Sequence, residues 1–162
     1  MAGEQATTTR IDLAELAPRM IQASAAVATG RLRLVSPGET FRRLAEGDAD
    51  VVAQFRRELA HQVSSTLIWM DPHVIAVYQD PATQPDRLDA PLRIIVHVKV
   101  ETAALRNLIA SIGEALREAR VGGLPPLEHM SVEATIVDEH SLQVADRGYL
   151  VLQGHVEPLV AR

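Results

Sequence analysis

The pattern of apolar and polar residues divides the chain into a helical first part and a strand-rich second part. Up to about residue 70, apolar residues recur every three or four positions, which is the spacing of one helix face. From Asp71 onward they recur at every second position, which is typical of a strand with one buried face. The sequence therefore predicts helices first and a sheet afterwards.

Three helices are predicted in the first part. The first spans 11–29, and Pro18 is expected to kink it or to restart it as a first-turn residue. The stretch "SPGE" at 36–39 has the pattern of a capping box, which predicts a short helix ending at Gly47. A longer helix follows over 51–69, with the only tryptophan closing the core at its end.

The second part reads as strands around one long amphipathic helix. The expected order is strands at 73–79 and 92–100, a helix at 101–121, and strands at 129–138, 141–145 and 148–157. This order predicts an α+β fold, in which a two-layer, mostly antiparallel sheet packs on the long helix. In outline it resembles ferredoxin-like and ACT-like modules, a likeness of architecture that implies no function.

Length and composition indicate one globular domain. With 162 residues and 47% hydrophobic content, the chain can bury a sizeable core. We expect a flexible tail at 1–10 and a single domain at 11–162, with its helical part at 11–70 and its sheet part at 71–162. The N-terminus lacks the pattern of an export signal, and no apolar run is long enough to span a membrane, so a cytoplasmic location is expected.

Charge and cysteine content narrow the chemistry. The absence of cysteine removes disulfides, thiolate nucleophiles and cysteine-bound metals. The net charge of −5 disfavours nucleic acid as a partner, because a binding surface for phosphates is usually basic. Arginines on the predicted helices still offer one alternative, a nucleic-acid accessory role for a surface made of Arg42, Arg43, Arg56 and Arg57.

The strand "RIIVHVKVET" at 93–102 carries two different faces. Ile94, Val96, Val98 and Val100 form an apolar face, whereas the opposite face mixes apolar and polar residues. The later strands repeat this design, and such a half-polar face suits coverage by the N-terminal helices or by a second copy of the chain. The residues predicted to form this interface are Ile95, His97, Val137, Tyr149 and Val151.

The same face carries candidate metal ligands. His97, Glu133 and His155 are residue types that bind Zn²⁺, Fe²⁺ or Mn²⁺, and two imidazoles with one carboxylate could form an open catalytic site. No diagnostic spacing such as HExxH supports this. Lys99 is expected to form an ion pair at an edge, and Asp71 with His73 to mark a helix-to-strand junction, rather than to do chemistry.

The sequence favours a non-enzymatic, homo-oligomeric structural or regulatory binding protein. Its expected partner is itself, or another protein, and its expected contact surface is the mixed sheet face or the N-terminal helices. No cofactor is expected, because motifs for phosphate or dinucleotide binding are missing from the sequence. The alternatives are a metal-assisted enzyme and a nucleic-acid accessory protein.

Overall fold

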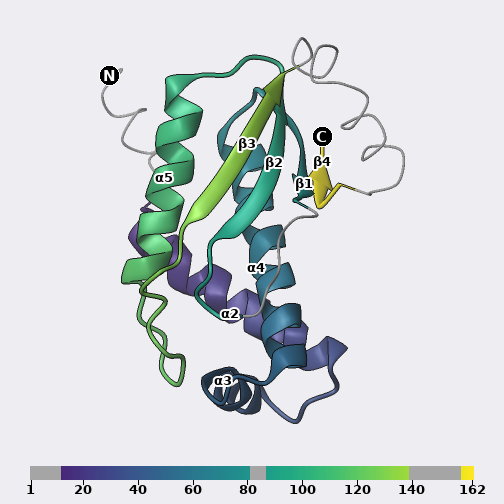
Figure 1. Ribbon diagram of the computed structural model, residues 1–162, viewed down its shortest axis with the longest axis vertical. Coiled ribbons are helices and arrows are strands. Elements are labelled where there is room, and N and C mark those ends of the chain that lie inside the picture. Colours follow the sequence, from purple (N-terminus) through teal and green to yellow (C-terminus); the bar gives the residue numbers. More distant parts are fainter. Residues whose placement is uncertain (1–11, 81–86, 139–157) are drawn as a thin grey trace, which may run out of the picture.

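The computed structural model describes residues 12–80, 87–138 and 158–162, and it has an α+β fold (Figure 1). Within these ranges four helices and four strands follow one another in the order α2 (Leu13–Arg31), α3 (Pro37–Ala45), α4 (Ala49–Met70), β1 (Val74–Gln79), β2 (Leu92–Val98), α5 (Ala103–Glu118), β3 (Val132–Asp138) and β4 (Val160–Ala161). The predicted division into helices and then strands is confirmed.

The four described strands form one mixed sheet in the order β3-β2-β1-β4. β1 is antiparallel to both β2 and β4, whereas β3 is parallel to β2. The parallel pair arises because α5 carries the chain from the end of β2 back to the start of β3. The ferredoxin-like or ACT-like layout is not confirmed by these four strands, and the strands predicted at 141–145 and 148–157 lie outside the described residues.

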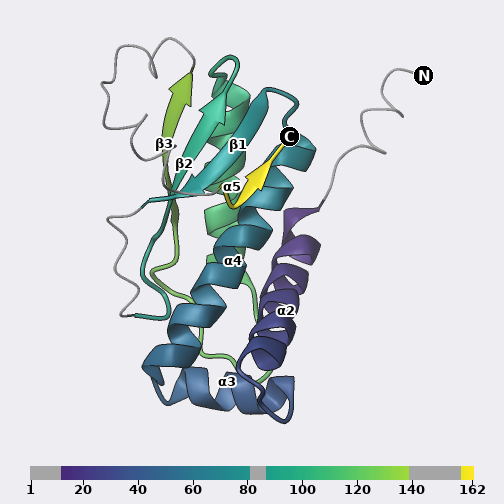
Figure 2. The same ribbon diagram turned by 90° about the vertical axis from the view of Figure 1, so that its right-hand side faces the viewer.

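Helices α2, α4 and α5 lie on one side of the sheet, and α3 lies beyond one end of it (Figure 1 and Figure 2). Figure 2 shows the sheet at one side of the molecule, with α4 next to it and α2 beyond α4, while α5 lies beside β3 in Figure 1. A single hydrophobic cluster joins both parts of the chain, and its largest fully buried side chains include Phe55, Leu59, Ile94 and Leu105. We call the sheet face turned away from these helices the open face.

Each described helix begins at a residue whose side chain accepts a hydrogen bond from the first turn. The capping residues are Asp12, Ser36, Asp48 and Thr102. Helix α2 continues through Pro18 as one helix of 19 residues, so it does not restart there. None of the helices in the described ranges is long and apolar enough to cross a membrane.

Four side chains differ in exposure from what the pattern of apolar and polar residues predicts. Trp69 is 70% exposed because it lies outside the buried stripe of α4, and Val100 is 54% exposed because β2 ends at Val98. Arg56 and Glu58, expected to face outward, are buried. Glu58 pairs with Arg31 of α2 (2.8 Å), so the neighbouring helix covers what would be a solvent face on an isolated α4.

The predicted capping box at the start of α3 is present with one difference. The Ser36 hydroxyl accepts from the Glu39 N–H (3.3 Å), as expected, but the Glu39 carboxylate accepts from the Val35 N–H (3.0 Å). That hydrogen bond, and next the Arg43 guanidinium, hold the pKa of Glu39 below its ordinary value of 4.5. The carboxylate therefore stabilises the folded protein while it is ionised.

We expect the Glu39→Gln variant to be less stable than the parent at neutral pH. A lowered pKa in the folded state means that the contribution of Glu39 is present above its ordinary pKa and lost as the pH falls through the lowered one. The difference in melting temperature should therefore shrink in acid. Thermal unfolding between pH 7 and pH 3 measures it, with the exposed Glu128→Gln as a control for net charge, and a difference that grows in acid would contradict the assignment.

Candidate functional site

The open face carries the residues that the alternation assigned to it. The parallel register places Arg93 beside Glu133, Ile95 beside Thr135, and His97 beside Val137. Residues paired in this way point to the same side of a sheet. The two faces of β2 and β3 are therefore divided as expected, with Ile94, Val96 and Val98 buried on the helix side.

Two of the predicted interface residues have almost no accessible surface. Ile95 is 7% exposed and Val137 is 4% exposed, although no described helix lies on the open face. These side chains offer little area to a partner. Tyr149 and Val151, the other apolar residues predicted for this interface, lie outside the described residues, so the predicted interface stays a prediction.

The structure does not bring His97 and Glu133 together. Glu133 pairs with Arg93 (3.1 Å), and it lies four register positions from His97, which corresponds to about 13 Å along a strand. The Nε2 atom of His97 is buried and has no hydrogen-bond partner among the described residues. His155 lies outside them, and no group of three potential metal ligands occurs within the described part of the chain.

The residues around the end of α4 have structural roles. The Asp71 carboxylate accepts from the His73 N–H (2.8 Å), so it fixes the turn between α4 and β1 and not the orientation of an imidazole. Lys99, predicted to form an ion pair, has none with any described carboxylate.

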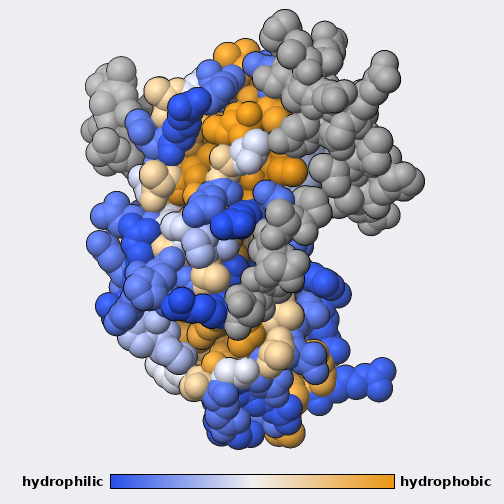
Figure 3. Space-filling view, viewed as in Figure 1, coloured by the Kyte–Doolittle hydropathy of each residue, from blue (hydrophilic) through white to orange (hydrophobic). Residues whose placement is uncertain are grey.

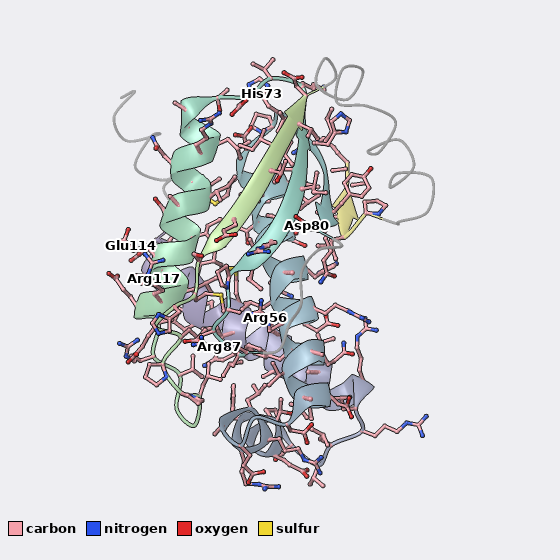
Figure 4. The ribbon with its side chains drawn as sticks, in the orientation of Figure 1. Arg56, His73, Asp80, Arg87, Glu114 and Arg117 are labelled. Carbon is pink, nitrogen blue, oxygen red and sulfur yellow. The ribbon has the colours of Figure 1, made fainter. Side chains whose placement is uncertain are left out.

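Three of the four arginines that were predicted to form a cationic surface already bind acceptors of the chain itself. Arg42 pairs with Glu46 (2.9 Å), and Arg43 pairs with Glu39 (3.1 Å). Arg56 is only 3% exposed, and its guanidinium donates to the carbonyl groups of three residues before β2, namely Leu88, Ala90 and Pro91, at 2.6–3.0 Å. Figure 4 shows Arg56 reaching from α4 toward this segment. Of the four arginines, only Arg57 is both exposed and without a described ion pair.

A groove between α5 and β3 is a surface feature that the sequence did not reveal. Its volume is about 440 Å³, and its lining consists of Glu101, Arg106, Ile109, Ala110, Val132, Ala134 and Ile136. Figure 3 shows apolar surface over this part of the sheet, bordered by hydrophilic side chains of α5. The groove depends on β3 being the edge strand of the described sheet, which no local pattern in the sequence shows.

One glycine closes the lower end of this groove. A Cβ at Gly113 would lie 3.0 Å from the Val132 nitrogen, which is tighter than ordinary contact, so glycine lets the α5 backbone approach β3 this closely without a shift of either element. Toward Ile136 and Glu101 the two elements leave the groove open. The groove thus lies directly beside the edge of β3 with which no described strand pairs, and it contains no cluster of catalytic groups in the part of the chain that the structure describes.

Comparison with known proteins gives no relative for this chain: no protein family, curated protein or solved structure matches it.

We expect Arg56→Met to destabilise the fold strongly. The change leaves three partly buried carbonyl groups without their charged donor, at a cost of about 3 kcal/mol. Urea unfolding measures the loss, and Arg57→Met is the matched control, because exposed Arg57 should change stability by less than about 0.5 kcal/mol. Equal effects of the two changes would contradict the role given to Arg56.

Proposed function

We propose that this is a non-enzymatic binding protein that works by assembling with further copies of itself. Its contact surface is the outer edge of β3 together with the groove between β3 and α5. The observation that carries the proposal is an edge strand with outward main-chain groups directly beside an apolar groove. An extended segment of a second copy is the occupant of this edge.

The hydrogen-bonding pattern shows which main-chain groups face outward. The Leu92 N–H donates to the Ser131 carbonyl (2.8 Å), so the main chain of Ser131 faces β2. Because alternate residues of a strand bond to the same neighbour, the main-chain groups of Val132, Ala134 and Ile136 face away from β2. β3 is the edge of the described sheet, so no described strand pairs with them.

The groove supplies the specificity that a bare strand edge lacks. An added strand would hydrogen-bond to Ala134 and Ile136 and would turn every second side chain toward α5. There it meets an apolar floor that includes Ile109 and Ala110, and a single ion pair, Glu101 with Arg106, at one end. Small apolar side chains at alternate positions are what this floor accepts.

Over Val132–Asp138 the edge of β3 lacks two of the usual devices that block pairing. Protected edges carry lysine, proline, a bulge or an inward-pointing charge. The strand Val132–Asp138 contains neither lysine nor proline. The carboxylate of Glu133 lies on the open face and is already paired with Arg93, so it does not guard the groove. The absence of lysine and proline supports the addition of a strand at this edge.

We expect Ala110→Arg to weaken assembly at least tenfold, equivalent to about 1.4 kcal/mol. Ala110 is exposed on α5 and lines the groove, so an arginine there blocks the added strand without disturbing the core. Native mass measured over a range of concentrations should give multiples of 17.7 kDa for the untagged parent and, at the same concentration, a lower average mass for the variant.

Ala26→Arg is the matched control, because Ala26 is an exposed alanine of α2 that does not line the groove. It should assemble as the parent does. A parent that stays at 17.7 kDa at every concentration would refute self-assembly. An Ala110→Arg variant that assembles normally would refute the β3 edge as the contact surface.

A further inference from the structure

The single tryptophan lies on a cationic part of the surface. Trp69 is 70% exposed in the last turn of α4. The Arg162 guanidinium donates to the carbonyls of Ile68 and Asp71, which flank Trp69 along the chain. The Lys99 N–H donates to the His73 carbonyl (2.8 Å), which places Lys99 beside the same turn. We call Trp69, Lys99 and Arg162 the Trp69 surface.

Neither cation of the Trp69 surface has an anionic partner within the part of the chain that the structure describes. Neither Lys99 nor Arg162 forms an ion pair with a carboxylate of the described residues. An exposed indole near two cations that form no described ion pair has the composition of an interaction surface, since Trp is enriched among residues that dominate binding energy. Such a surface fits a concave partner that is apolar inside and acidic at its rim.

A groove of that kind lies elsewhere on the same chain. It runs between the first turn of α2 and the second half of α5, has a volume of about 490 Å³, and is lined by Asp12, Leu13, Ala14, Ser111, Glu114, Ala115, Glu118 and Ala119. Its floor is made mainly of leucine and alanine side chains, and its rim carries three carboxylates. We call it the acidic groove.

The two glutamates at the rim of the acidic groove form no ion pair with a cation of the described residues. Glu114 and Glu118 are one helical turn apart, where like charges repel, and neither pairs with a described cation. Arg117 donates instead to the Met130 carbonyl (2.8 Å). Arg120 donates to the carbonyls of Arg117 and Ala119, so it satisfies the end of α5 and not the rim.

We propose that the Trp69 surface of one copy docks into the acidic groove of a second copy. The indole would fill the apolar floor, Lys99 would pair with Glu114 or Glu118, and Arg162, whose Nε and Nη2 already donate to main-chain carbonyls, would pair with the other carboxylate through Nη1. The two surfaces are separate, as Figure 4 shows from the positions of His73 and Glu114. This inference rests on the proposed self-assembly, but it uses a contact that does not involve the β3 edge.

Because the chain has a net charge of −5, two copies repel each other overall, and a matched pair of oppositely charged surfaces selects one relative orientation. When the Trp69 surface of one copy docks into the acidic groove of a second, the first copy still has an unused acidic groove and the second an unused Trp69 surface. The contact therefore continues to further copies unless a ring closes or a two-fold axis makes the contact twice.

The fluorescence of Trp69 tests this docking directly, because the chain has no other tryptophan. We expect the emission of the parent to shift to shorter wavelength as concentration rises, since docking removes the indole from water. Glu118→Lys should require at least a tenfold higher concentration for the same shift. Glu128→Lys, the same charge change at an exposed residue outside the groove, should behave as the parent does.

The Ala110→Arg variant separates the two proposals. It blocks the β3 edge and should leave the concentration-dependent shift of Trp69 in place. A parent that assembles with unchanged emission, or a Glu118→Lys variant that shifts as the parent does, would overturn the docking and leave the proposed function standing. A parent that is monomeric at every concentration, with constant emission, would overturn both.

Discussion

A buried positive charge joins the helical part of this chain to its sheet. The Arg56 guanidinium projects from α4 into a region where it is only 3% exposed, and a charge removed from water in this way must be surrounded by acceptors. The carbonyls of Leu88, Ala90 and Pro91 meet that need, and they directly precede β2. The guanidinium therefore fixes where β2 begins, and with it the strands on both sides of β2.

The position of β2 determines which surfaces remain available. β1 and β3 occupy its two edges, and the described helices cover one face of the sheet. The parallel connection through α5 returns the chain at β3, so α5 lies beside the edge strand. An edge strand beside a helix produces a groove lined by both elements, and here the close approach at Gly113 shuts that groove at one end. The binding surface is thus a consequence of topology.

Local chemistry could be predicted from the sequence, whereas long-range contacts could not. Ser36 caps α3 as the pattern indicated, and β2 begins at Leu92 as expected, because caps and alternation depend only on near neighbours. The burial of Arg56 depends on a segment 32 to 35 residues away. The separation of His97 from Glu133 depends on strand register, and the exposed edge of β3 depends on strand order. The spacing of residues along one strand shows neither the register nor the order of the strands.

The pairing of β4 with β1 gives the sheet a distinctive order of completion. Arg162 donates to the carbonyl of Val74, 88 positions earlier in the chain, and its N–H donates to Ile75. Contacts over such separations form slowly, because a long loop must close before they are made. During synthesis β1 and β2 leave the ribosome well before residues 159–162 do. Until then, the edge of β1 that pairs with β4 has no partner strand. Until β4 is in place, that edge of β1 offers unpaired main-chain groups to which a strand of another chain can bond.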